Sequence, residues 1–245
     1  MLDRARFTTS RRPPAYLALA GLFLVATAPA VAGDAPASAR SLALADLARQ
    51  APAAGLVAGD LAGVVVTDEV RTGHNGVTHV YFRQRVHGLE IDGAEMGIHV
   101  DRAGRVFHRT GSFVADAAAR AAEVPGFPLL GPDEAVVAAA GHLGLAPVAG
   151  LALVASPGGA ERAAVFANDA VSEDTIPVRL RYLRLPDSDR LRLAWNLVID
   201  DPRSADWWDL WVDAESGALV RRVNWTAHAT YRVFASPKES PDDGD

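Results

Sequence analysis

Residues 76–96 read GVTHVYFRQRVHGLEIDGAEM. Between Thr78 and His87 apolar and polar side chains alternate with a period of two, which is the repeat of a strand with one buried face. The predicted inward set is Val80, Phe82, Gln84 and Val86, and the outward set is His79, Tyr81, Arg83, Arg85 and His87. The pattern predicts a strand that covers a hydrophobic core with one of its faces.

Turn residues after this strand predict a meander of antiparallel strands. Gly88 and residues 92–93 (Asp-Gly) supply turn signals, and residues 101–104 (DRAG) predict a hairpin turn before a further short strand. A second alternating run lies between these turns and comprises Met96, Ile98 and Val100. The first half of the chain is therefore predicted to fold as a small sheet.

Gln84 is the polar residue on the predicted inward face. A buried amide without a partner would cost ~1–3 kcal/mol, so a hydrogen bond is expected. We predict that the Gln84 amide binds backbone groups of the adjacent turn near Gly88.

A stretch rich in Pro and Gly, residues 124–128, precedes a second region. Pro132 and the acids after it predict a helix that runs to about His142, with Gly144 as its stop. Several apolar runs follow, including a regular alternation at residues 190–199. A helix followed by an antiparallel sheet predicts an α+β fold of two small domains, each an antiparallel sheet with one or more helices packed on it.

The first 32 residues predict a signal peptide, because a basic start is followed by an apolar run at residues 15–25 and by Ala-Val-Ala at residues 30–32. Its removal leaves 29 acidic and 20 basic residues, a formal charge of −9. Such a chain is not expected to bind nucleic acid. Cysteine is absent, which excludes disulfides and thiolate chemistry. We therefore expect a secreted protein that meets a membrane only through an uncleaved signal peptide.

Short catalytic motifs are missing from the sequence. No histidine is followed by glutamate, so the zinc motif H-E-x-x-H is absent. The sole lysine precedes Glu239, which excludes a phosphate-binding G-x-x-x-x-G-K-[ST], and no G-x-S-x-G occurs. The sequence predicts that this chain is not an enzyme and has no catalytic, cofactor-binding or metal site.

Two weaker candidate sites have ordinary structural explanations. His79, His87 and His99 could gather on one sheet face, but Arg83 and Arg85 between them would oppose a cation by ~1 kcal/mol or more per pair. Histidines that face solvent or a partner are therefore favoured. The tryptophans are expected to form core plus a partner-facing patch, and they are Trp195, Trp207, Trp208, Trp211 and Trp225.

The run at 76–96 resembles the fungalysin/thermolysin propeptide domain, and residues 193–199, 211–217 and 227–234 are similar to the PepSY-like second domain and the end of fungalysin pro-regions. The resemblance implies a structural signature made of Tyr81, Phe82, Gln84, Gly88, Gly104, Trp195, Asp213 and Gly217. It also implies a division of the chain. The expected parts are a signal peptide (1–32), an Ala/Pro-rich arm (33–54), a propeptide-like domain (55–122), a PepSY-like domain (128–226) and a linker (227–245).

The resemblance further implies a function. The chain would be an intramolecular chaperone and inhibitor of a fungalysin-like zinc metalloprotease, with the protease catalytic domain as its partner and zinc only in that domain, which is missing here. Cleavage is expected in the linker, at Ser236, Pro237, Lys238, Glu239, Ser240 and Pro241. The alternatives are a free-standing secreted inhibitor or binding protein and, less favoured, an unrecognised enzyme or membrane-tethered sensor.

Overall fold

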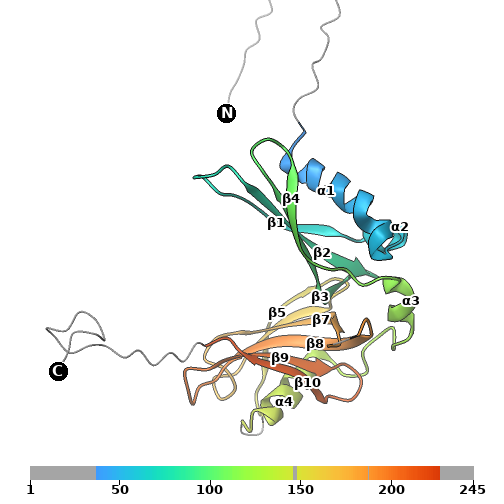
Figure 1. Cartoon of the computed structure of the whole chain (residues 1–245). Helices are drawn as coiled ribbons and strands as arrows, with labels where there is room; N and C mark the ends of the chain where they lie inside the picture. The colour runs from blue at the N-terminus through green and yellow to red at the C-terminus, as the bar shows by residue number, and fades with distance from the viewer. Residues whose placement is uncertain (1–36, 146–147, 187, 227–245) are drawn as a thin grey trace, which may run out of the picture. The chain divides into compact units, whose positions relative to one another are not determined.

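The computed structural model describes residues 37–145, 148–186 and 188–226 (Figure 1). The predicted signal peptide and the predicted cleavage segment lie outside these residues. The helices are α1 (Ala39–Gln50), the 3-10 helix η1 (Ala51–Ala54), α2 (Ala58–Ala62), α3 (Ala117–Ala122) and α4 (Pro132–His142). The strands are β1 (Val65–Arg71), β2 (Thr78–Val86), β3 (Leu89–Val100), β4 (Val106–Gly111), β5 (Ala152–Gly158), β6 (Ala163–Ala167), β7 (Ile176–Arg184), β8 (Leu191–Asp200), β9 (Trp207–Asp213) and β10 (Leu219–Asn224).

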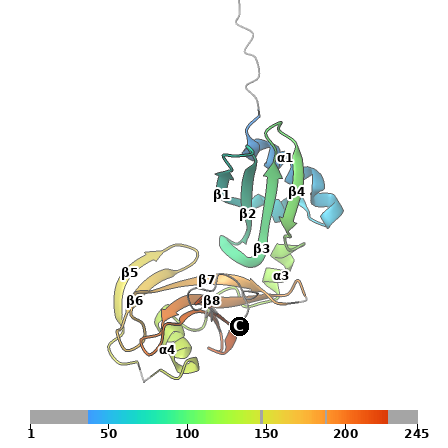
Figure 2. The same ribbon diagram turned by 60° about the vertical axis from the view of Figure 1, so that its left-hand side comes forward.

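Strand β2 shows the predicted alternation. Val80, Phe82, Gln84 and Val86 are buried, whereas Tyr81 between them is exposed. Strands β1 to β4 pair in the antiparallel sense and lie side by side in front of α1 (Figure 2). Their buried face carries a core cluster to which α1, in the predicted arm, contributes alongside Phe82. The α1 residues in this cluster are Ala43 and Leu47.

The turn between β2 and β3 is a two-residue hairpin. Val86 pairs with Leu89, and the two residues between them, His87 and Gly88, have φ values of 52° and 80°. Two successive positive φ angles match the type I′ turn, whose twist suits the right-handed twist of paired strands. At this φ the backbone of most residues that carry a side chain would be strained, which favours glycine at position 88.

Residues 92–93, predicted as a turn, are part of an irregularity inside β3. Arg83 pairs with Glu95 and Arg85 pairs with Glu90, so the residues between these two glutamates leave the β2 ladder. Gly93 adopts φ 82°, which allows the backbone to bend there. The freed residues Ile91 and Asp92 pair with β7 in the parallel sense. The turn prediction was wrong because Asp-Gly suits a bulge as well as a hairpin.

All ten strands form one sheet that is joined through the β3–β7 pairing, and its part from β5 to β10 is called the second sheet. Helix α4 packs against this part. The α4 helix begins with Pro132 in its first turn, and the Glu134 carboxylate accepts the backbone N–H of Gly131 at 2.7 Å. Leu143 follows the helix, and Gly144 has φ 67°. The helix and its end are confirmed as predicted. Trp195 of β8 is fully buried, and its Nε1 donates to the Leu130 carbonyl at 3.0 Å.

The core of the second sheet extends into the first half of the chain. Val86, Leu89 and Ile91 of the first half belong to the same buried cluster as Tyr182 and Leu193 of the second half. All described residues fall in one compact unit of contacts. The α+β class is confirmed, while β1, α2 and α3 were not predicted. The domain boundaries at 55–122 and 128–226 stay a prediction.

Candidate functional site

Gln84 joins two chain segments that are distant in sequence. Its side chain is 0% exposed. The Gln84 Nε2 donates to the Val114 carbonyl at 2.8 Å and to the Asp60 carbonyl at 3.2 Å, and its Oε1 accepts the Val114 N–H at 2.8 Å. The inward orientation agrees with the sequence pattern, but the predicted partner was wrong, because the amide reaches across the sheet face instead of along the strand to Gly88.

Asp60 of α2 completes this buried polar group. Its carboxylate accepts the backbone N–H groups of Val57 at 3.0 Å, Asp116 at 3.1 Å and Ala117 at 2.9 Å. Asp116 has φ 54°, an uncommon value for a residue with a side chain. The Asp60 carboxylate thus holds the strained entry into α3. Together Gln84 and Asp60 fasten α2, β2 and the chain before α3 to one another.

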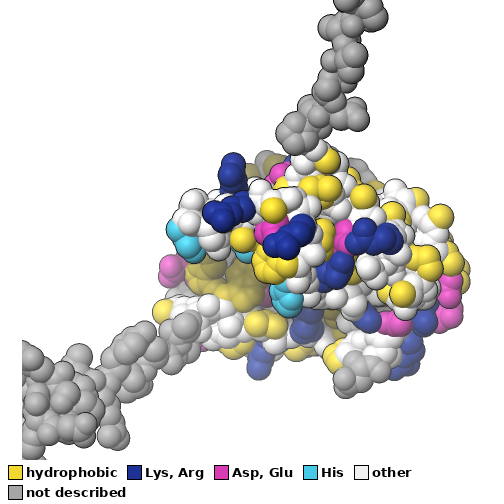
Figure 3. Space-filling model, turned by 45° about the horizontal axis from the view of Figure 1, so that its top comes forward, with side chains coloured by type: hydrophobic (Ala, Val, Ile, Leu, Met, Phe, Trp, Pro, Cys, Tyr) yellow, Lys and Arg dark blue, Asp and Glu magenta, His cyan; other side chains and the backbone are white. Residues whose placement is uncertain are grey.

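Glu90 is the centre of an ion-pair network where β3 meets β7. Its carboxylate is 7% exposed and contacts Arg85 at 2.7 Å, Arg83 at 2.8 Å and Arg181 at 3.2 Å. Burial by itself would raise the pKa of Glu90, but the hydrogen bonds from Arg85 and Arg83 and the charge of Arg181 outweigh burial and lower it. A second pair, Arg221 to Asp92 at 2.6 Å, links β10 to β3. Figure 3 likewise shows basic and acidic side chains next to one another on the face turned to the viewer.

The candidate histidines divide between two places. His79 and His99 approach with their Nδ1 atoms 2.7 Å apart, and the His99 ring stacks on His108 with centroids 5.4 Å apart. The Thr72 hydroxyl lies 3.0 Å from His79 Nε2, and the rings of Tyr81 and Phe107 also lie near His99. His87 lies in the β2–β3 turn.

A hydrogen bond between two ring nitrogens occupies the lone pair that a shared cation would need. Arg83 and Arg85, expected to oppose a cation near these rings, are instead paired with Glu90. Across the described part of the chain, no group of three or more His, Cys, Asp or Glu side chains is placed to hold a metal ion.

The remaining signature residues lie in two tight turns. Asp213 accepts the backbone N–H groups of Glu215 at 3.1 Å and Ser216 at 2.8 Å, and Arg192 pairs with it at 3.0 Å. Burial alone would raise the pKa of Asp213, but these hydrogen bonds lower it. The residues with positive φ in the two turns are Gly217 (73°) and Gly104 (78°). Asp213, Gly217 and Gly104 therefore stabilise the conformation of these turns.

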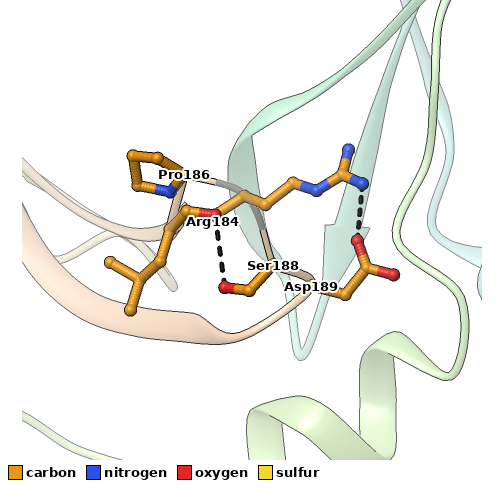
Figure 4. Close-up of a pocket in the computed structure, with 5 residues that line it drawn as sticks. Arg184, Pro186, Ser188 and Asp189 are labelled. Atoms are coloured by element: carbon orange, nitrogen blue, oxygen red, sulfur yellow. Dashed lines mark hydrogen bonds and ion pairs between the residues drawn. The ribbon is translucent and has the colours of Figure 1, made fainter.

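A cavity of about 440 Å³ lies at the end of β7 (Figure 4). Arg184 extends across it and pairs with Asp189 at 2.5 Å, so the two charges neutralise each other. The Ser188 hydroxyl donates to the Leu185 carbonyl at 3.4 Å. A serine nucleophile needs an adjacent base, and the residues that line this cavity include no histidine. The described lining residues therefore form no serine–histidine pair.

Sequence reasoning missed Asp60 and Glu90, which are buried and have several polar partners each. A signal existed for Glu90, because it follows two arginines on the neighbouring strand of a predicted hairpin. None existed for the contacts of Asp60 with Asp116 and Ala117, which lie 56 and 57 residues away. Within the described ranges, no helix has the length and apolar character that a membrane crossing requires.

Residues 62–113 match the family described as the fungalysin/thermolysin propeptide motif. This match contains Gln84, Gly88 and Gly104, and it begins two residues after Asp60. Asp60 itself, like the second sheet, lies outside it.

Over a longer stretch the chain is similar to fungal proteins. It is 29% identical over 180 residues to extracellular metalloproteinase 5 of Trichophyton rubrum, which covers 73% of this chain and 28% of that protein. It is 30% identical over 179 residues to extracellular metalloproteinase MEP of Leptosphaeria maculans, covering 71% of this chain and 27% of that protein. The chain thus spans under a third of the length of these relatives.

Among solved structures, the Bacillus megaterium YpeB C-terminal domain matches with 10% identity and a TM-score of 0.35, covering 77% of this chain and 64% of that one. A likeness of that extent supports no conclusion about function. The motif over residues 62–113 and the fungal relatives do agree with each other. Residues 62–113 thus carry the fungalysin/thermolysin propeptide motif, and about 180 residues of the chain are homologous to part of the fungal extracellular metalloproteinases.

Proposed function

We propose that this chain is a secreted pro-region that assists the folding of a fungalysin-like zinc metalloprotease and holds it inactive. The observation that carries the proposal is the propeptide motif over residues 62–113 in a chain related to extracellular metalloproteinases. A motif of this name belongs to the part of a precursor that accompanies the protease domain. The partner is then the catalytic domain of such a protease, and zinc belongs to that domain.

The chemistry of the described residues supports a binding role over catalysis. Gln84, Asp60 and Glu90 are buried polar groups of the first half, and each has backbone or arginine partners. Groups so engaged stabilise a fold and are not free to attack a substrate. We therefore propose that the chain itself is not an enzyme.

Affinity for the protease has to come from the folded surface. A standard protein interface buries about 800 Å² on each partner, which a sheet face of this size can supply. The second sheet, which we propose is a PepSY-like domain, presents exposed tryptophan, and the formal charge after the proposed signal cleavage is −9. Cleavage between Ser236 and Pro241 would then release the protease.

Inhibition tests the proposal directly. The full chain is added to an active fungalysin-type protease, and peptide hydrolysis is measured as its concentration rises. We expect inhibition at micromolar or lower concentration. A Phe82→Asp variant is the control. Phe82 is fully buried, so the new charge should unfold the chain, and the variant should not inhibit.

A refolding experiment distinguishes a pro-region that assists folding from a protein that only inhibits. The denatured catalytic domain is diluted into buffer with and without the chain, and recovered activity is compared after the inhibitor is removed. A pro-region raises the yield of active protease. Inhibition without any gain in refolding would favour the alternative, a free-standing secreted inhibitor, and a folded chain that does neither would contradict both.

A further inference from the structure

A small pocket lies where β7 and β9 begin and β8 and β10 end. Its volume is about 260 Å³. Pockets that enclose drug-sized molecules are larger, at about 300–1,000 Å³. It is lined by Ser172, Asp174, Thr175, Pro177, Val198, Asp200, Trp207 and Trp225. Its size suits one long side chain.

Two tryptophans of this pocket have exposed rings. Trp207 is 45% exposed and Trp225 is 56% exposed. The backbone N–H of Trp225 donates to the Trp207 carbonyl at 2.7 Å, and the Thr226 hydroxyl accepts the Trp207 N–H at 3.0 Å. The two indoles are therefore attached to one framework and are held near each other before any ligand arrives.

Two other tryptophans of the second sheet, the buried Trp211 and the partly buried Trp208, each have an arginine over the ring. The guanidinium carbon of Arg221 lies 4.7 Å from the Trp211 ring centroid, and that of Arg222 lies 4.8 Å from the Trp208 centroid. Both distances are within the range of cation–π attraction. Among described residues, no such cation lies over Trp207 or Trp225.

Trp211 shows how a cation is bound beside a tryptophan and a carboxylate on this sheet. Trp211, Asp209 and Arg221 form a group in which the arginine stacks on the indole and lies 3.8 Å from the carboxylate. Trp207 stands on the same strand, and its cross-strand partner is Asp200. A tryptophan and an aspartate are thus neighbours at two places on this sheet, along β9 at Trp211 and across β8 and β9 at Trp207, and of these two tryptophans only Trp211 has an arginine over its ring among the described residues.

The carboxylates of the pocket have no cationic partner within the part of the chain that the structure describes. Asp174 accepts hydrogen bonds from its neighbour Thr175, at 2.6 Å from the backbone N–H. Asp200 is fixed through its backbone, whose N–H donates to the Ser172 hydroxyl at 3.0 Å. Two charges beside two exposed indoles attract a group that is both cationic and flat.

We propose that this pocket binds an arginine side chain presented by a partner polypeptide. The planar guanidinium stacks on an indole and donates to a carboxylate at the same time, which an ammonium group does less well. The inference does not depend on protease inhibition, because a chain that inhibits nothing can still bind arginine here.

The test is a titration followed by the indole N–H signals of the isotopically labelled full chain in NMR. The probe is the tripeptide acetyl-Gly-Arg-Gly-amide, and the neutral isostere with citrulline in place of arginine is the matched ligand. Trp207→Phe and Trp225→Phe assign the two signals. We expect saturable shifts of these two signals with the arginine peptide and at least about tenfold weaker binding of the citrulline peptide.

Variants of single acids test the role of charge. Asp200→Asn should weaken binding at least about fivefold, since it removes a charge with little change of shape. Glu215→Gln removes an equal charge in the turn at the other end of β9 and should leave binding within about twofold. Equal binding of both peptides, no saturable shift in the folded chain, or shifts caused only by a neutral sugar such as a methyl glucoside would each overturn the proposal.

Discussion

At the scale of single residues, the buried polar side chains carry the most specific contacts. Gln84 satisfies three backbone groups, and each of them would be left without a partner if the amide were removed. A buried group without a partner costs about 1–3 kcal/mol. The position therefore depends on an amide, which can donate and accept at once.

Replacing Gln84 tests this account. Gln84→Leu should lower the free energy of unfolding by at least about 2 kcal/mol in urea denaturation, whereas Gln50→Leu on the exposed face of α1 should change it by under about 0.5 kcal/mol. Gln84→Glu should cost more at pH 7 than near pH 4, because burial raises the pKa of the new carboxyl above its ordinary value of about 4.3 and the charged form is disfavoured in the fold. Equal stability of Gln84→Glu and the parent at pH 7 would contradict the assigned contacts.

His99 gives the fold a dependence on pH. Burial, followed by the positive charges of His79 and His108, lowers the pKa of His99. The unfolded chain then binds a proton more readily, so the stability due to His99 is present above about pH 6.5 and is lost as the pH falls toward the lowered pKa. His99→Gln should flatten the change in unfolding free energy between about pH 5 and 7. His74→Gln, at an exposed position, is the control, and an equal flattening there would show that His99 has no special role.

At the scale of elements, two glycines with nearly the same backbone conformation differ in the space around them. Gly111 has φ 75°, and a Cβ there would lie 2.1 Å from the Glu95 carbonyl oxygen. Gly150 has φ 76°, with nothing within 4 Å of such a Cβ. Both should lose stability as alanine, since positive φ strains any side chain, but only Gly111 also brings β4 close to β3.

Thermal denaturation of the two alanine variants separates these effects. Gly150→Ala should cost about 1 kcal/mol from backbone strain alone. Gly111→Ala should cost about 2–4 kcal/mol, because the β3–β4 ladder must open to admit the methyl group. If both variants lose the same stability, the close approach at Gly111 does not hold in solution.

Sequence analysis predicted best the helices and strands that have a regular alternation of side chains or have start and stop residues close by in the sequence. Strand β8 alternates around Trp195, and α4 begins at Pro132 and ends before Gly144. Strand β1 was missed because five of its seven residues are exposed, so its side chains show no alternation. The bulge near Gly93 was taken for a turn because its second partner, β7, lies far along the chain.

The candidate sites show the same difference between local features, which the sequence predicts, and contacts between distant segments, which it does not. The inward position of Gln84 could be predicted from the period of β2, but its partners could not, since Val114 and Asp60 meet it only after the chain has folded. The arginine pocket requires the register of β8 and β9, which aligns Asp200 with Trp207. No local motif in the sequence encodes that pairing.

At the scale of the whole molecule, the shared core predicts a single unfolding transition. All five tryptophans lie at residues 195–225, so tryptophan fluorescence reports on the second half of the chain. Phe82 belongs to the cluster of the first half, and Phe82→Ala should cost about 3–5 kcal/mol. We expect this variant to lower the melting temperature seen by tryptophan fluorescence, with equal calorimetric and van't Hoff enthalpies for the parent. An unchanged fluorescence transition would mean that the halves unfold independently.

The change of partner along β3 also sets an order of events during synthesis. Ile91 pairs with Tyr182, so its partner emerges only after about 90 further residues have been made. At roughly 5–20 residues per second, that interval is roughly 5–20 s. Throughout it, Leu89 and Ile91 lack the strand that buries them, and Glu90 has two of its three arginines. A nascent chain that stops before β7 would expose an apolar strand edge, a form prone to aggregate and to be degraded.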